Sequence, residues 1–360
     1  MRPADARGWA AGVLLAICLA PAAAHQPITS KYTYNEHVYP VLRDHCGRCH
    51  FPGGPTPMSL LTHADAAPWA ESIREQLAQD AMPPVFVDPA GPAVKHAVTL
   101  PARELDMLLT WAAGGTPQGD PARTPPPPPE PTAWRQGTPD LLLPVPAQTL
   151  MAGELAGERL VTLDTALTGE RWVKLVDVRP GTPSMVRGVT VTTDQGVTLA
   201  AWVPGDPAQA GPSGAAFRLA AGARLQVRIR YKKHWKDEQV ARTDASELGV
   251  YFTTPPVTGR ALDGVDVSGR VPLARPLRVL AVRPTIDRAF AAVRIDALHD
   301  GRRVPLLHLQ AARPGWDRRY WLDEPVELPA GAIIEVTADA AGEDAAPTTM
   351  PPVALDALPL

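Results

Sequence analysis

The residues whose types and spacing could do chemistry stand together at Cys46-Gly47-Arg48-Cys49-His50. Two thiols two residues apart, followed at once by a histidine, are typical of covalent haem attachment, in which each thiol adds to a vinyl group and the imidazole ligates iron. A thioredoxin-like redox pair would follow a strand, whereas the residues before Cys46 have a helical pattern. A structural zinc site would need a second ligand pair, and no other Cys-x-x-Cys exists. We therefore predict one haem c, held by Cys46, Cys49 and His50.

A second ligand for the iron is expected in the run Asp80-Ala81-Met82-Pro83-Pro84. A thioether is a good sixth ligand and raises the reduction potential relative to two histidines. The two prolines restrict the backbone and would hold the Met82 sulfur in place. The alternative interpretation is that Met82 fills a gap in the core. Met58 is a competing ligand, but it follows His50 too closely for the chain to reach the other haem face.

Electron transfer through such a haem needs no acid or base, so the sequence predicts no catalytic residues. Other histidines near the motif could replace the methionine as an axial ligand. Their neighbours in the sequence do not mark them for this role, and we interpret them as surface residues: His37, His45, His63 and His96.

Helical patterns surround the motif. Apolar residues recur with helical spacing over Tyr34–His45, Ala64–Gln79 and Pro101–Ala113, and Gly114-Gly115 ends the last of these helices. A terminal helix that crosses the first helix beside the haem is the arrangement of small cytochromes c. The sequence therefore predicts an all-α haem domain over residues 31–116.

The N-terminus has the features of an export signal. Arg2 and Arg7 precede the apolar run Trp9–Ala20, and small residues follow up to Ala24. We predict a signal peptide over residues 1–24, cleavage after Ala24 and a periplasmic or otherwise exported mature chain. Cys18 would leave with the signal, so the mature chain would keep two cysteines, both used in thioethers. No later segment is apolar for long enough to cross a membrane.

The composition of the chain indicates which partners and which domain boundary to expect. The formal net charge of -3 gives no electrostatic reason to expect nucleic acid as a partner. Residues 117–140 are rich in proline, including Pro125–Pro129, which favours an extended polyproline linker between domains. We therefore expect a domain boundary there.

Short runs rich in β-forming residues recur after Leu141. The clearest is Leu225–Lys232, in which apolar and mostly basic residues alternate, as in a strand with one buried face. Similar runs are Arg171 to Val178, Gly188 to Thr193, Val197 to Val203, Leu277 to Val282, Ala291 to Ala297 and Ile333 to Thr337. They predict antiparallel β-sandwiches over residues 141–258 and 259–340, followed by a flexible tail over 341–360. No nucleotide-binding loop, nucleophile elbow or zincin helix is present.

The chain resembles bacterial proteins that join an N-terminal cytochrome c domain to a copper type II, ascorbate-dependent monooxygenase-like module, related to peptidylglycine α-hydroxylating monooxygenase. The matching residues are Cys46–His50 with Phe51-Pro52-Gly53-Gly54-Pro55, Ser59-Leu60-Leu61-Thr62, Met82-Pro83-Pro84, Gly137-Thr138-Pro139-Asp140, Arg179-Pro180-Gly181, Tyr251-Phe252, and Pro325 to Pro329 followed by Ile334-Glu335-Val336-Thr337. The resemblance implies a monooxygenase-like pair of sandwiches with two copper sites, held mainly by histidines.

The copper ligands that the resemblance implies are absent from this sequence. Arg187-Gly188 stands where a His-His pair is expected, and Arg230 and Lys232 replace expected histidines in the following strand. Pro284-Thr285-Ile286-Asp287 replaces a Pro-His-Met-His run, and the available late methionine, Met350, lies outside any strand pattern. Arginine cannot deprotonate to ligate a metal. We therefore expect no copper.

The resulting hypothesis is an exported c-type cytochrome. Its haem would pass one electron to or from a redox partner protein that the sequence does not identify, and the copper-less module would serve as docking or scaffold surface. One alternative is a copper-dependent monooxygenase or oxidase with rebuilt ligands, which requires His234, His299 and His308 to converge. Another is a haem-based gas sensor with an open sixth position. A cluster of Arg187, Arg230 and Lys232 could also form an anion site.

Overall fold

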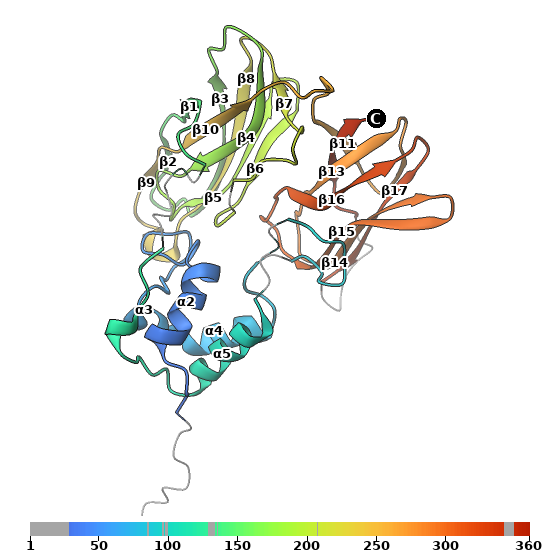
Figure 1. Ribbon diagram of the computed structural model, residues 1–360. Coiled ribbons are helices and arrows are strands. Elements are labelled where there is room, and N and C mark those ends of the chain that lie inside the picture. The colour runs from blue at the N-terminus through green and yellow to red at the C-terminus, as the bar shows by residue number, and fades with distance from the viewer. Residues whose placement is uncertain are drawn as a thin grey trace, which may run out of the picture.

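The computed structural model describes residues 29–360 except 85, 96, 98, 99, 129–133, 135, 207 and 342–348. The predicted signal peptide with Cys18, the histidine at position 96 and part of the linker lie outside the described residues. Figure 1 shows a small helical group at the N-terminal end and two β-rich parts, one beside the other. Within the described ranges, no helix is long and apolar enough to cross a membrane.

The helical group consists of short helices joined by turns. They are a π-helical turn η2 (Tyr34–Val38), α2 (Tyr39–Val41), a second π-helical turn η3 (Leu42–Cys46), α3 (His63–Ala66), a 3-10 turn η4 (Ala67–Trp69), α4 (Ala70–Ala78), α5 (Ala102–Ala113) and a 3-10 turn η5 (Pro121–Arg123). Thr62 caps α3 by accepting a hydrogen bond from the Asp65 amide. Leu108 and Trp111 on one face of α5 are fully buried against Tyr34 and neighbouring apolar side chains. This burial holds the short helices together.

The expected all-α domain over residues 31–116 is wrong, and so is the fold class built on it. The chain is mostly β, and the longest helix, α5, has only 12 residues. Between α4 and α5 the chain leaves the helical group and lies against the C-terminal β part, through the bridges Val87↔Leu309 and Val94↔Leu322. We call residues 86–95 the strap. Prolines 89 and 92 prevent helix there, and the extended backbone finds its hydrogen bonds at β-strands instead.

The first β part follows the linker. Its strands are β1 (Leu141–Pro144), β2 (Gln148–Leu150), β3 (Ala156–Asp164), β4 (Arg171–Arg179), β5 (Val186–Thr193), β6 (Thr198–Trp202), β7 (Phe217–Leu219), β8 (Arg224–Lys232), β9 (Arg242–Asp244) and β10 (Glu247–Thr253), with a 3-10 turn η6 (Trp235–Asp237). They form two four-stranded sheets, β1-β10-β4-β7 and β3-β8-β5-β6, and a β2-β9 pair. Side chains of both four-stranded sheets meet in one apolar core. This is a β-sandwich, the first sandwich below.

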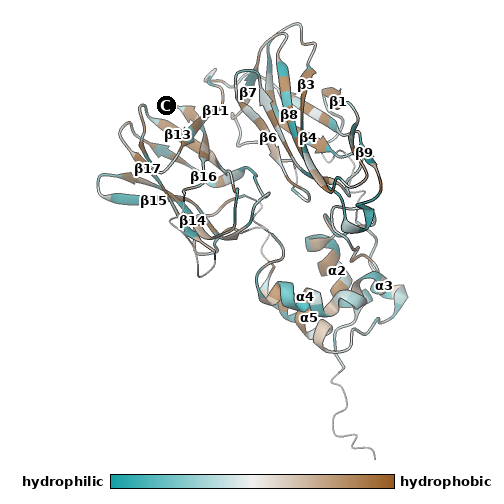
Figure 2. Ribbon diagram, turned by 180° about the vertical axis from the view of Figure 1, so that it is seen from behind, coloured by the Kyte–Doolittle hydropathy of each residue, from teal (hydrophilic) through white to brown (hydrophobic). Residues whose placement is uncertain are grey.

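The alternation of β8 shows why the sequence folds this way. Leu225, Val227 and Ile229 are fully buried, while the residues between them are exposed. Figure 2 shows hydrophilic and hydrophobic residues alternating along the strands of this sheet. One face of each strand therefore enters the core and the other meets water.

The second β part comprises β11 (Asp263–Val267), β12 (Arg270–Pro272), β13 (Leu277–Pro284), β14 (Phe290–His299), β15 (Arg302–Ala312), β16 (Tyr320–Leu328), β17 (Ile333–Ala340) and β18 (Val353–Pro359). Two four-stranded sheets, β11-β18-β13-β16 and β12-β17-β14-β15, enclose a second apolar core. We call it the second sandwich. It contacts the first sandwich through Leu280, Ala281 and Trp321, which join the first core.

The expected flexible tail over residues 341–360 is wrong for its last part. Strand β18 lies inside a sheet, between β11 and β13. The residues Val353–Ala357 are all buried, so the strand has no exposed face and no alternation to reveal it in the sequence.

Candidate functional site

The Cys-x-x-Cys-His motif continues the helical turn that ends at Cys46. The amides of Cys49 and His50 both donate to the Cys46 carbonyl, at 3.0 and 2.9 Å. Gly47 packs so tightly that an added Cβ would lie 2.5 Å from the Arg43 carbonyl oxygen. The motif therefore winds as a compact turn, and this position needs glycine.

His50 is buried within this turn. It is 8% exposed, and burial lowers its pKa while a hydrogen bond to the Met58 backbone opposes the shift. The Nδ1 atom has no hydrogen-bond partner among the described residues. A neutral imidazole with a spare buried nitrogen is what an axial haem ligand requires. Both observations fit the predicted role of His50.

The two motif cysteines are free thiols. Burial raises the pKa of Cys46 to about 12 and that of Cys49 to about 11. Reactive redox pairs have lowered thiol pKa values, because the thiolate is the nucleophile. The geometry therefore speaks against a thioredoxin-like redox pair.

Cys49 lies against the first sandwich. A Cβ added at Gly205, in the loop between β6 and β7, would lie 2.6 Å from the Cys49 sulfur. The charges of Arg187 and Asp206 are close enough to act on the Cys49 thiol. A second contact is made by His234, whose Nε2 donates to the Pro55 carbonyl at 3.1 Å. The motif and the loop after it are thus seated on this sandwich.

The loop between β6 and β7, which contains Gly205, also reaches the second sandwich. Asp206 accepts a hydrogen bond from Arg318 at 2.7 Å. Burial raises the pKa of Asp206 to about 6, and the charges of Arg318 and Arg48 oppose this shift. Gly205 and Asp206 therefore join the motif to both sandwiches. Sequence reasoning did not identify Gly205 or Asp206, because no local pattern tells which loop meets a distant motif.

Met82 stands at the start of the chain segment that runs into the strap. It is 38% exposed and belongs to none of the apolar cores of the described chain, so it does not fill a core gap. The competing Met58 packs on the helical core. The role of Met82 as second ligand stays a prediction.

The other histidines near the motif have local partners. His63 Nε2 bonds the Thr116 carbonyl, His37 Nδ1 contacts the Thr33 hydroxyl, and His45 pairs with Glu104 at 2.8 Å. These contacts give each of them a structural role in the helical group.

The prediction of a metal-binding helical cytochrome domain is wrong. Within the described ranges, no three His, Cys, Asp or Glu side chains converge as metal ligands, and the helical domain itself is absent.

The three histidines required for rebuilt copper sites do not converge. His308 lies opposite Arg294 on β14, five residues before His299, so the two histidines are about 17 Å apart at about 3.4 Å per residue. His234 belongs to the first sandwich and bonds Pro55. Their separation removes the geometric basis of the copper enzyme alternative.

The cations that replace the expected copper ligands have separate partners. Arg187 donates to the Val186 and Ser184 carbonyls, and Arg230 donates to the Gly315 carbonyl and pairs with Asp317 at 3.4 Å. Lys232 is exposed. Arg187 and Arg230 thus each have partners of their own.

Comparisons with known proteins give no family. No protein-family model and no curated protein matches the chain. The major capsid protein of bacteriophage PM2 matches with 10% identity and a TM-score of 0.28, over 59% of this chain and 97% of that one. A conserved protein of unknown function from Pseudomonas aeruginosa PAO1 matches with 14% identity and a TM-score of 0.18, over 60% of this chain and 100% of that one. TM-scores this low define neither fold nor function.

Proposed function

We propose that the protein is an exported electron carrier with one covalently bound haem. Cys46 and Cys49 would hold the haem through thioethers, His50 would ligate its iron, and Met82 would be the second axial ligand. The bound haem supplies a reversible one-electron couple. The observation that carries the proposal is the buried, neutral His50 imidazole, whose Nδ1 has no partner among the described residues, directly after two free cysteines.

In this proposal, residues of the chain attach the haem, keep water from its ligand and hold the motif in place. Burial of the motif keeps water from the His50 imidazole, which favours the neutral form that can ligate. The first sandwich covers Cys49 through Gly205 and Arg187. The sandwiches thus act as a scaffold that fixes the motif and carries the surface on which a redox partner docks.

The proposal is tested on protein exported from a host with haem-attachment machinery. We expect about one haem and one iron per chain, no stoichiometric copper, and haem that stays on the chain under denaturing conditions because thioethers are covalent. The Cys46→Ser/Cys49→Ser variant should lose the denaturant-resistant haem. Haem that dissociates on denaturation of the unmodified chain, or one copper per chain that survives dialysis, contradicts the proposal.

The second axial ligand is tested by a matched pair of methionine variants. Met82→Leu should abolish the weak red absorption band that methionine coordination gives ferric haem, and Met58→Leu should keep it. If the band survives in Met82→Leu, Met82 is not the ligand. A six-coordinate site closed by methionine also predicts slow binding of carbon monoxide by the reduced protein.

A further inference from the structure

The segment that carries Met82 connects two parts of the molecule. Figure 1 shows the chain after α4 passing from the helical group to the second sandwich. Met82 lies on this connection and belongs to none of the apolar cores of the described residues. Its position must therefore come from the residues that precede and follow it in the chain.

The connection is fixed at its first end by α4. Asp80, just after the helix, has a left-handed backbone with φ +50. Its amide donates to the Leu77 carbonyl at 3.2 Å, and the Ala81 amide donates to the Gln76 carbonyl at 2.9 Å. These are the two bonds of a Schellman motif, which closes a helix. Ala81 is also buried, so Met82 directly follows a residue that is packed with α4.

The connection is fixed at its other end by Phe86, the first residue of the strap. The Phe86 carbonyl accepts a hydrogen bond from the Gln310 amide of β15 at 2.7 Å. Phe86 is buried, and its ring stands edge-on to the ring of Trp316, in the loop between β15 and β16, with 6.2 Å between the ring centroids. The Phe86 backbone is left-handed, with φ +57. Because a bulky residue keeps such a backbone only where contacts around it hold it, the second sandwich fixes Phe86.

The chain between these two fixed points has little freedom. Pro83 and Pro84 have a restricted φ, and the residue before a proline is restricted as well. Met82 and Pro83 are each followed by a proline, so both are limited in this way. Phe86 follows Met82 by four residues, which span at most about 14 Å. A displacement of Phe86 therefore moves Met82, because few backbone torsions between them are free to absorb it.

We propose that Phe86 and Trp316 are positioning residues for Met82. Because it concerns Met82 as the second axial ligand, this role rests on the function proposed above. A ligand has to be held within about 0.5 Å of its productive position by the residues around it. The contact of Phe86 with Trp316 holds the Met82 thioether in that position, and loss of the contact opens the sixth position of the haem iron. The second sandwich thus helps to keep the haem six-coordinate.

The test uses the full chain exported with its haem and two variants that remove opposite sides of one contact. Phe86→Ala and Trp316→Ala should each weaken the red band of the ferric protein at least about twofold. Each should also make carbon monoxide bind the reduced protein at least about threefold faster, in proportion to the open fraction. The double variant should show no larger effect than the stronger single variant, because both changes remove the same contact. A lower reduction potential should accompany these changes, since methionine ligation raises it.

Ile334→Ala is the matched control. Ile334 is fully buried in the core of the second sandwich, but it lies on β17, which pairs with β12 and β14 and not with the strap. Its loss should cost stability without changing the red band or the rate of carbon monoxide binding. Hydrogen exchange of the Gln310 amide gives a readout that does not depend on the haem. It should quicken in Phe86→Ala and stay close to that of the unmodified protein in Ile334→Ala.

An unchanged red band and carbon monoxide rate in both Phe86→Ala and Trp316→Ala would overturn the positioning role. Equal changes in Ile334→Ala would also overturn it, because any loss of stability in the second sandwich would then have the same effect. Met82→Leu separates this role from the function proposed above. If Met82→Leu keeps the band, the ligand itself is wrong and the positioning role falls with it. If Met82→Leu loses the band while Phe86→Ala and Trp316→Ala keep it, only the positioning role is wrong.

Discussion

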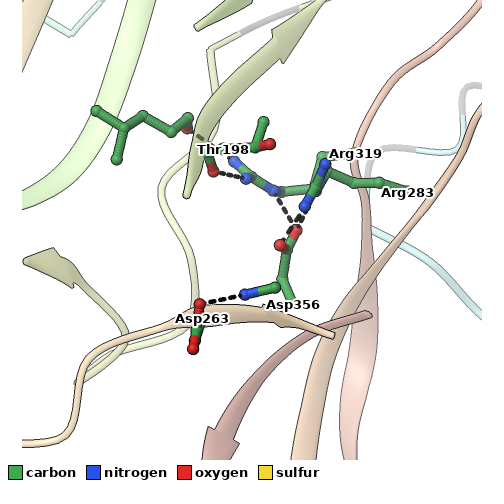
Figure 3. Close-up of polar contacts among 7 residues, drawn as sticks. Thr198, Asp263, Arg283, Arg319 and Asp356 are labelled. Carbon is green, nitrogen blue, oxygen red and sulfur yellow. Dashed lines mark hydrogen bonds and ion pairs between the residues drawn. The ribbon is translucent and has the colours of Figure 1, made fainter. Parts of the chain in front are cut away.

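Asp356 is a buried carboxylate that pairs with two arginine side chains. Asp356, on the β18 strand that sequence patterns did not reveal, balances Arg283 and Arg319 at 2.9 and 2.7 Å. Arg319 also donates hydrogen bonds to the Leu199 and Thr198 carbonyls of β6 in the first sandwich (Figure 3). One carboxylate therefore supports both the second sandwich and its contact with the first.

Asp356→Asn should destabilise the protein by about 3–5 kcal/mol, because it leaves two largely buried guanidinium groups without a counter-charge. The control is Asp287→Asn, which breaks the exposed pair with Arg288 and should cost about 0–1 kcal/mol. Unfolding free energies from urea titrations measure both. Equal losses in the two variants would show that the buried carboxylate has no special role.

Asp206 should make stability depend on pH. Its pKa in the folded protein is about 6 instead of 3.8, because burial disfavours the charged form. Between pH 3.8 and about 6, Asp206 keeps its proton in the folded chain but has lost it in the unfolded chain. The protonated Asp206 therefore stabilises the folded state at low pH, and this contribution is lost as pH rises through about 6. The unmodified protein should therefore lose stability relative to Asp206→Asn as pH rises over this window.

The measurement for Asp206 is a series of urea titrations at several pH values. Asp194→Asn, which removes an exposed carboxyl group between β5 and β6, should follow the unmodified protein at every pH. A constant difference between Asp206→Asn and the unmodified protein would contradict the raised pKa.

At the scale of elements, the strap determines where the helical group stands. The Asp88 amide donates to the His308 carbonyl. Beside the Val94↔Leu322 bridge, the Lys95 amide donates to the Trp321 carbonyl and the Asp323 amide donates to the Ala93 carbonyl. These bonds add short extended segments to β15 and β16. The helical group is thus tied to the second sandwich as well as to the first.

Lys95→Pro should release this end of the strap, because proline cannot donate the bond that the Lys95 amide makes to the Trp321 carbonyl at 2.8 Å. Hydrogen exchange of strap amides should quicken, and protease cleavage near residue 95 should increase. Ala93→Pro is the control, since the Ala93 amide makes no bond among the described residues. Equal exchange in the two variants would show that this bond does not hold the strap.

At the scale of the whole molecule, the loop between β6 and β7 connects the three parts. Gly205 meets Cys49, Asp206 meets Arg318, and an added Cβ at Gly211 would lie 2.9 Å from the Trp321 ring. This loop therefore contacts the motif and both sandwiches.

Gly205→Ala should weaken the packing of the Cys46–His50 motif on the first sandwich, because the added Cβ would lie 2.6 Å from the Cys49 sulfur. Gly214→Ala is a matched control, since Gly214 has nearly the same backbone angle, φ +81 against +80, but no atom within 4 Å of an added Cβ. The loss of unfolding free energy should be greater in Gly205→Ala by about 1–3 kcal/mol. Faster exchange of the Cys49 and His50 amides would accompany it, and equal losses in both variants would argue against the contact.

The sequence by itself determined the local features. Helical spacing located α5, since Leu108 and Trp111 fall on one face, and alternation located β8, since its apolar residues are two apart. The Cys46–His50 motif also stood out, because covalent attachment needs those residue types at that spacing. Each of these signals depends on neighbours within one turn or one strand.

The tertiary structure decided what these elements meet. It showed that the helices form no separate all-α domain, because the proline-containing segment between them finds its backbone partners on distant strands. It placed β18 inside a sheet, where burial of both faces removes the alternation that sequence patterns rely on. It also set Cys49 against Gly205, and Arg319 beside Asp356, contacts between residues far apart in the chain. Such contacts follow from how complete layers pack, and no local pattern of side chains encodes them.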